Sequence, residues 1–264
     1  MIGLEISSAS KIGCVREQNE DMILVDNHFV RDDEYETQLT LSHEDRYIIA
    51  VADGMGGHNR GDVASSDTLH NLQYYYHDIP LGLSASEFNE ALVGWLDSIN
   101  NFVASKGRAD EQYKGMGTTL VGLAYYGGDI YSLNCGDSRL YRFRDGELIQ
   151  LTTDHSLNTM LGSAKHSSII TNCIGGGCTN SYLDIVKLTD DICPGDIYLL
   201  CSDGLSDMVR DDRISRMLAE GASANLLCDA AVENGGLDNV SACVITIKQE
   251  NDHAIKITRQ VTGH

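Results

Sequence analysis

Strand-like runs joined by very short turns fill residues 118–151, and they limit the possible folds more than any other feature of the sequence. Gly127-Gly128 and Asp145-Gly146 each separate two apolar runs by two residues, a spacing typical of β-hairpins. Parallel strands need crossover connections of about a dozen residues or more, which these turns cannot supply. We therefore predict an antiparallel meander here, which excludes a doubly wound parallel sheet.

Apolar periodicity predicts further strands and helices outside the meander. The expected strands cover residues 5–12, 22–25, 47–52, 182–188, 197–202 and 240–247. Helical spacing is found over residues 64–79, after a capping box formed by Ser84 and Glu87, and over residues 213–220 and 223–233. The acidic stretch 26–46 is interpreted as an exposed excursion, and 157–177 as a loop or short helix.

The composition is that of an acidic globular protein. The 264 residues are 42% hydrophobic, and 39 acidic residues against 19 basic ones give a formal net charge of −20. Such a charge repels phosphate backbones and anionic membrane surfaces, so we predict neither a nucleic-acid partner nor a membrane partner. No apolar run approaches the ~18 residues of a membrane span, and the N-terminal residues lack a signal-peptide pattern, so a cytoplasmic location is expected. The eight cysteines include no C-x2-C pair and are predicted to be reduced thiols.

Acidic residues recur where predicted strands meet turns. Those at strand ends beside a turn are Asp53, Asp137, Asp203 and Asp238, and Glu20 and Asp21 come just before another strand. Each alone also fits a local Asx turn or a solvated loop. If the strands pack together, carboxylates within ~5 Å of one another would repel by ~1 to 4 kcal/mol per pair, so a cation is needed between them. Mg²⁺ and Mn²⁺ prefer carboxylate oxygen, whereas zinc fits less well without a His or Cys cluster.

Two such ions would support a definite chemistry. Held ~3.5 to 4 Å apart by a shared carboxylate, they would bind one water between them, lower its pKa and aim it at a phosphorus atom. Arg16, five residues before Asp21, is the candidate for binding the phosphate oxygens, because a guanidinium matches them bidentately. No C-x5-R loop is present, which argues against a covalent cysteine mechanism.

Six short motifs occur in a fixed order along the chain. They are R-x-x-N-E-D at 16–21, D-G-M-G-G-H at 53–58, G-T-T at 117–119, G-D-S-R at 136–139, S-D-G-L at 202–205 and D-N-V-S at 238–241. Any one of them is weakly specific. The ordered set, within residues 10–247, resembles the metal-dependent protein phosphatases of type 2C, and the form of the second motif resembles their bacterial branch.

The resemblance implies an α+β fold, a four-layer α-β-β-α sandwich of two antiparallel sheets flanked by helix pairs. It also implies a phosphatase domain over residues 1–250 with a C-terminal tail over 251–264. The implied activity is hydrolysis of phosphoserine and phosphothreonine in proteins, by direct attack of a water that bridges two Mg or Mn ions. A third, weaker metal site is implied as well.

The same resemblance assigns roles to individual residues. Asp53 would bridge both metals, the Gly54 carbonyl and Glu20 would reach the second metal, and Asp203 and Asp238 would hold the first. Asp137 would form the third site with Asp203. Arg16 would bind the substrate phosphate, and Asp21 would support Arg16 or a metal-bound water.

Two features leave alternatives open. His58 could protonate the leaving oxygen of the substrate, or it could be a hydrogen-bonding surface residue. Only about 17 residues, Leu157 to Cys173, stand where bacterial relatives usually have a longer flap. Docking of a substrate beside the third metal is therefore an open question, whereas the two-metal residues are all present.

Three functions compete at this stage. The first is the phosphoprotein phosphatase, the second a non-catalytic phosphoprotein-binding module of the same fold, and the third a small-molecule phosphatase that uses the same metals. Retention of every metal carboxylate and of Arg16 argues against the second. A phosphorylated protein is the expected partner, a cognate Ser/Thr kinase is a further candidate, and a monomer is expected because no coiled-coil heptads occur.

Overall fold

Two antiparallel sheets of six strands each form the centre of the molecule, which we describe from a computed structural model covering residues 1–56, 60–162 and 169–248. The first sheet has the order β11-β10-β14-β15-β1-β4 and the second the order β13-β9-β8-β5-β2-β3. The strands of the first sheet are β1 (Ile2–Lys11), β4 (Glu34–Leu41), β10 (Arg139–Arg144), β11 (Glu147–Gln150), β14 (Ile197–Cys201) and β15 (Val240–Lys248). Those of the second are β2 (Met22–Val25), β3 (His28–Val30), β5 (Arg46–Ala52), β8 (Leu120–Tyr126), β9 (Asp129–Cys135) and β13 (Asp184–Lys187).

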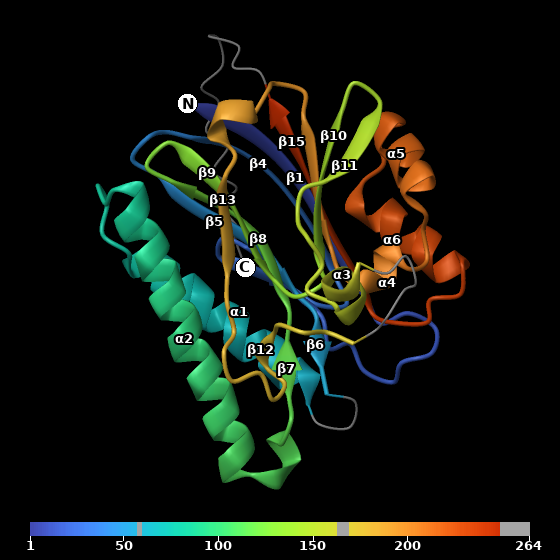
Figure 1. Cartoon of the computed structure of the whole chain (residues 1–264). Coiled ribbons are helices and arrows are strands. Elements are labelled where there is room, and N and C mark those ends of the chain that lie inside the picture. The colour runs from blue at the N-terminus through green and yellow to red at the C-terminus, as the bar shows by residue number, and fades with distance from the viewer. Residues whose placement is uncertain (57–59, 163–168, 249–264) are drawn as a thin grey trace, which may run out of the picture.

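Helices cover the outer faces of both sheets (Figure 1). α1 (Gly61–Asp78) and α2 (Ala85–Ala109) pack on the second sheet, and α2 begins with the predicted capping box of Ser84 and Glu87. α4 (Asp203–Ser206), α5 (Asp211–Ala219) and α6 (Ala224–Glu233) pack on the first sheet. The short elements are α3 (Leu157–Leu161) and the 3-10 turns η1 (Glu111–Tyr113) and η2 (Thr189–Asp191). The expected four-layer sandwich is confirmed.

A third, small sheet lies beside the main ones and joins distant parts of the chain. It has the order β12-β7-β6, formed by β6 (Gly54–Met55), β7 (Gly117–Thr118) and β12 (Ile174–Gly175). The residues of β6 directly follow Asp53, so the backbone after that aspartate is held by hydrogen bonds from another strand.

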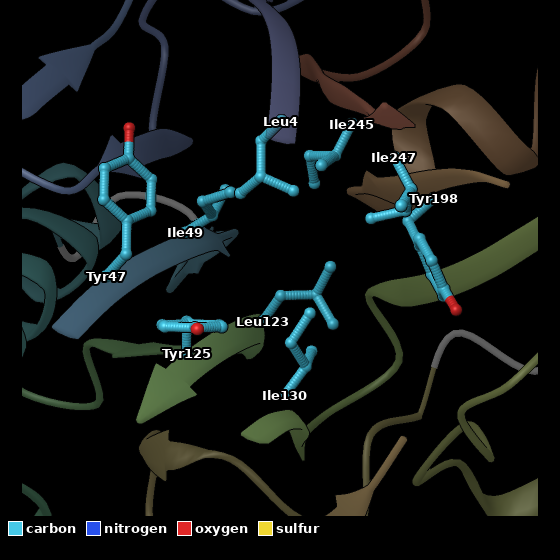
Figure 2. Close-up of a pocket in the computed structure, with 9 residues that line it drawn as sticks. All are labelled: Leu4, Tyr47, Ile49, Leu123, Tyr125, Ile130, Tyr198, Ile245 and Ile247. Carbon is cyan, nitrogen blue, oxygen red and sulfur yellow. The ribbon is translucent and has the colours of Figure 1, made fainter. Parts of the chain in front are cut away.

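Apolar side chains of both sheets fill the space between them. Figure 2 shows Leu4 and Ile245 of one sheet facing Ile49, Leu123 and Ile130 of the other around a gap of about 20 Å³. Such a gap has room for about one water molecule, so this core is closed to larger ligands. Hydrophobic burial between two sheets is therefore a main source of stability for the site at the strand ends.

Truncating a side chain of this inner core should destabilise the protein. Ile49 is 2% exposed, and Ile49→Ala is expected to lower the free energy of unfolding by about 3 kcal/mol through lost burial and a new cavity. Denaturant unfolding at saturating Mn²⁺ measures the loss. Ile149→Ala, at a position that is 37% exposed, is the control and should cost much less; equal losses would contradict the description of the core.

The prediction of one continuous meander over residues 118–151 is wrong. β8 and β9 form a hairpin in the second sheet, while β10 and β11 form one in the first. The chain changes sheets at Gly136, whose φ is 132° and whose Cβ, if present, would lie 2.6 Å from the Thr119 side chain. Apolar and polar residues alternate in the same way whether two hairpins belong to one sheet or to two sheets that face each other across a core.

The prediction of an exposed excursion over residues 26–46 is also wrong. The segment contains β3 and β4, and β4 pairs with β1 as the edge of the first sheet. Tyr35, Leu39 and Leu41 alternate with polar residues along β4, so a strand signal was present among the acidic residues. An edge strand that is half solvent-exposed tolerates many charges, which conceal this alternation.

The remaining expectations concern the chain ends and the membrane. The predicted tail, 251–264, lies outside the described residues, and the division at residue 250 stays a prediction. Across the described segments, no helix is long and apolar enough to cross a bilayer.

Candidate metal centre

Asp53 stands at the end of β5 and is held by its backbone. Its N–H donates to Thr119 Oγ1 at 3.0 Å, and its carbonyl oxygen accepts from Thr119 N–H and from Thr118 Oγ1, both at 2.9 Å. These three bonds leave the carboxylate as the only part of the residue free to turn toward a ligand. The G-T-T motif thus positions Asp53.

Glycine at position 54 is required by a close approach of three segments. A Cβ there would lie 2.3 Å from Gly61 O and 2.5 Å from Glu20 O, so any side chain would push the start of α1 and the Glu20 loop away. Gly56, two residues further along this turn, has a positive φ of 146°. Gly57 lies outside the described residues.

The Glu20-Asp21 pair is fixed by hydrogen bonds from three other segments. Glu20 Oε1 accepts from Gly61 N–H at 3.0 Å at the start of α1, and Glu20 N–H donates to Asn239 Oδ1 at 2.9 Å. Asp21 is buried, and its Oδ2 accepts from Ser202 Oγ at 2.7 Å. Asp21 Oδ1 is buried without a hydrogen-bond partner in the described structure, which is costly for a carboxylate.

The aspartates predicted to converge do act on one another. Burial, then the charges of Asp21, Asp203, Asp137 and Asp238, raise the pKa of Asp53 well above its usual range. Its carboxyl and that of Asp203 share a side-chain hydrogen bond. Two carboxyls can share such a bond only if one of them holds a proton, so the metal-free site keeps at least one proton.

The neighbouring carboxyls are perturbed in the same direction. Burial raises the pKa of Asp203 to about 6, with a further contribution from Asp238. Burial and the charge of Asp203 raise the pKa of Asp137 to about 7. Burial raises the pKa of Asp21 to about 7, although the hydrogen bond from Ser202 opposes the shift. A cation bound beside these groups would stabilise their charged forms.

Arg16 lies at the rim of this acidic cluster. Its guanidinium Nη2 donates to Asp238 Oδ2 at 2.6 Å, and Asp238 Oδ1 accepts from Asn239 N–H at 2.8 Å. The hydrogen bond to Asp238 is the main cause that raises the pKa of Arg16, and the charges of Glu20 and Asp53 add to it. The predicted phosphate ligand and the predicted metal ligand are thus paired with each other.

A divalent cation fits this donor set. Within residues 1–56, 60–162 and 169–248, no three acidic, histidine or cysteine side chains form a close set that could enclose an ion. However, the buried Asp21 oxygen without a partner and the mutual repulsion of the acidic groups around Asp53 are features that a bound cation would relieve. All-oxygen donors favour Mg²⁺ or Mn²⁺ over zinc.

A buried polar network beneath the site was missing from the sequence-based prediction. Ser202 Oγ links Asp21 to Ser241 N–H, and Ser241 Oγ donates to Ser10 Oγ, which also accepts from Asn19. The serines stand in the S-D-G-L and D-N-V-S motifs, so the signal was present without an assigned role. Buried hydroxyls that satisfy one another hold the Asp21 carboxylate in a fixed orientation.

Asn239 was also missed, although it organises the loop that carries Arg16. Its Nδ2 donates to Ile12 O at 2.9 Å and to Gln18 O at 3.0 Å, while its Oδ1 holds Glu20 N–H. One amide side chain therefore satisfies three backbone groups of residues 12–20. A short polar residue beside Asp238 gave no indication of these contacts before the fold was known.

The segment after Asp154 is anchored to the turn that holds Asp137. His155 is buried; its Nδ1 accepts from Gly136 N–H at 3.1 Å, so Nε2 carries the proton and donates to Asp184 Oδ2 at 2.9 Å. Asp154 pairs with Arg139 of the G-D-S-R motif. Residues 157–177, interpreted as a loop or short helix, form α3 and β12 in their described part. His58 lies outside the described residues.

Two antiparallel sheets between helix layers, with aspartates gathered at the strand ends, define an α+β protein with an acidic site. Comparison with known proteins gives the class. The sequence model of the protein phosphatase 2C family matches residues 25–231. The chain belongs to this family.

Individual relatives are similar along nearly the whole chain. The serine/threonine protein phosphatase PstP of Mycobacterium tuberculosis is 31% identical over 92% of this chain, which spans 45% of that relative's length. Protein phosphatase PhpP of Streptococcus pneumoniae is 30% identical, with 94% of this chain and 99% of the relative covered. A crystal structure of the PstP catalytic domain with two manganese ions superposes with a TM-score of 0.71 at 31% identity, over 94% of this chain and 100% of the other.

Proposed function

We propose that this chain is a Mg²⁺- or Mn²⁺-dependent phosphatase that hydrolyses phosphoserine and phosphothreonine in proteins. The observation that carries the proposal is the convergence of Asp53, Asp203, Asp137 and Asp21 beside an arginine. Membership of the protein phosphatase 2C family and the manganese ions of the similar PstP structure support it.

The proposed ligands divide among two principal ions and a weaker third. Asp53 would bridge the two, with the Gly54 carbonyl and Glu20 toward one ion. Asp203 and Asp238 would hold the other, and Asp137 would complete a third site with Asp203. Bound divalent ions would supply Lewis acidity toward the phosphoryl group and would lower the pKa of water for direct attack.

The chain's own residues would bind and orient the phosphate. Arg16 is exposed at the rim, and its guanidinium is paired with Asp238. If Asp238 bound a cation, its ion pair with Arg16 would weaken, and the Arg16 guanidinium could then donate to two phosphate oxygens. Asp21 is too deeply buried to reach a substrate, so its role is to orient the site from below through Ser202. A role of His58 as proton donor stays a prediction.

Hydrolysis of a phosphothreonine peptide with Mn²⁺, with Mg²⁺ and with EDTA tests the proposal. Phosphate release is expected only with a divalent ion, and Asp203→Ala should abolish it. Asp212→Asn is the matched control because Asp212 is an exposed aspartate on α5. No release by a protein that still binds Mn²⁺ would favour the phosphoprotein-binding module. Faster release from nucleotide or sugar phosphates than from the peptide would favour the small-molecule phosphatase.

The substrate and the state of the protein are further parts of the proposal. We infer that the chain acts in the cytoplasm as a monomer and that a cognate Ser/Thr kinase is among its phosphorylated substrates. The phosphorylated kinase should be hydrolysed faster than a generic phosphopeptide, and equal rates would contradict this pairing.

The monomeric state and the location have tests of their own. Light scattering should give a mass near 28.8 kDa, and twice that mass would overturn the monomer. Recovery of the protein with membranes would overturn the cytoplasmic location.

A further inference from the structure

Two thiols face each other across the glycine turn that follows β12. Cys173 Sγ and Cys178 Sγ are 3.1 Å apart, while no disulfide joins them. A disulfide requires about 2.05 Å between the sulfurs, so an approach of about 1 Å would be enough to form the bond. This pair lies outside the metal centre and has no role in the proposed hydrolysis.

The backbone of the turn brings the two side chains together. Gly175, Gly176 and Gly177 all have positive φ, and Cys178 N–H donates to Gly175 O at 2.8 Å. A Cβ on Gly176 would lie 2.8 Å from Cys173 Sγ, so the Cys173 side chain crosses the turn over a residue that has no side chain. The G-G-G run therefore provides the space in which the thiols meet.

The two thiols differ in access to solvent. Cys173 is buried, whereas Cys178 is partly exposed and lines a groove of about 530 Å³. Arg108, near the end of α2, and Tyr113 also line this groove. A small oxidant can therefore reach Cys178 first, with Cys173 directly behind it.

We propose that Cys173 and Cys178 are a redox-active dithiol that a hydroperoxide converts into an intramolecular disulfide. The Cys178 thiol loses its proton, and the thiolate attacks a peroxide oxygen and breaks the O–O bond. This step gives a sulfenic acid, and with hydrogen peroxide the departing hydroxide takes up the proton and leaves as water. Cys173 sulfur then attacks the Cys178 sulfur, and the sulfenic oxygen leaves as a second water. Two thiols lose two electrons and two protons, and a small thiol reductant reverses the change.

The order of the two steps follows from the environments of the thiols. Burial raises the pKa of the Cys173 thiol, which disfavours a first attack by its thiolate. Cys173 is suited to the second step, because its sulfur is already in contact with Cys178. Cys135 is a neighbour that influences the pKa of Cys173, so it is the competing partner that an experiment must exclude.

The site also adjoins the backbone that supports Asp53. Cys173 directly precedes β12, β12 pairs with β7, and Thr118 of β7 donates to the Asp53 carbonyl. The disulfide would close a loop around β12. It would form two strands away from the metal centre, without involving any metal ligand.

Peptide mapping of the full chain after exposure to hydrogen peroxide tests the proposal. Cleavage after Lys165 and Lys187 leaves both cysteines on one tryptic peptide. After alkylation of free thiols, this peptide should be unalkylated and two hydrogens lighter than its reduced form, and prior dithiothreitol should restore two alkylated cysteines. Cys135→Ser should give the same result, whereas Cys173→Ser should leave Cys178 as a sulfenic or higher acid.

Other outcomes would overturn the proposal. One is full alkylation of both cysteines at a peroxide concentration that oxidises the exposed Cys14 or Cys193. Another is a link from Cys173 or Cys178 to Cys135. Peptide mapping of the unsubstituted chain is enough to show whether the disulfide forms. A variant that fails to fold therefore does not affect the conclusion.

Discussion

Asp53→Asn is expected to abolish phosphate release and, at the same time, to raise the melting temperature of the metal-free protein. Loss of the carboxylate that we propose as the bridging metal ligand should slow hydrolysis on the order of a thousandfold, equivalent to about 4 kcal/mol in the barrier. In the metal-free state the same carboxylate is half-buried beside Asp21, Asp203 and Asp137, and desolvation and these three charges raise its pKa. An amide removes that repulsion and can donate to Asp203, a gain of about 1 to 3 kcal/mol.

Activity and thermal unfolding of one protein preparation check both parts of this prediction. The melting temperature in EDTA should rise by a few degrees, whereas Mn²⁺ should stabilise the variant less than the parent chain. Asp212→Asn, an exposed aspartate far along the chain on α5, should change neither quantity appreciably. A variant that loses stability in EDTA would show that the Asp53 carboxylate has a purely structural role in the metal-free fold.

Metal-free protein is expected to lose stability as the pH rises from about 4 to about 7. Asp203, Asp21 and Asp137 have folded-state pKa values of about 6, 7 and 7, against 3.8 for an ordinary aspartate. Between these values the folded state binds more protons than the unfolded state, so the free energy of unfolding falls with rising pH. Each group contributes up to about 1.4 kcal/mol per pH unit, and less where the titrations are coupled.

Divalent ions should reverse this trend. Since carboxylates bind metal only when deprotonated, added Mn²⁺ should raise the melting temperature strongly at pH 8 and little at pH 5. Carboxyls whose pKa is lowered, such as Asp196 beside Arg144, stabilise the folded protein throughout this pH range. They lose that contribution to stability only in more acidic solution. Thermal scans with and without EDTA at the two pH values measure the difference. An effect of Mn²⁺ that is the same at both would contradict a site of protonated, crowded carboxyls.

The sequence predicted individual elements well where one local pattern decided them. The strand predicted at residues 22–25 is β2, and the capping box before α2 is formed as expected. The sequence-based prediction failed where the arrangement depends on which strands pair with which. The two hairpins of residues 118–151 show the same local pattern whether they belong to one sheet or to two sheets that face each other. Edge strand β4 was missed because its charges conceal its alternation.

The candidate site was likewise predictable from the sequence only in part. Strand ends beside turns, together with the ordered motifs, were enough to single out Asp53, Asp137, Asp203 and Asp238. The structure places the last three close enough for their charges to raise the pKa of Asp53. The contact of Arg16 with Asp238 could not be predicted, since 222 positions separate the two residues and neither has a local pattern that specifies the other.

By itself, the sequence determined the antiparallel class, the helices and the kind of donor atoms, because turn length, periodicity and side-chain chemistry are local properties. Only the tertiary structure decided which sheet each hairpin joins, how Ser202 and Asn239 hold the acidic loop, and that Cys173 meets Cys178. These contacts depend on the packing of segments far apart in the chain and on the direction of each side chain, which burial and hydrogen bonding settle only after the layers have assembled.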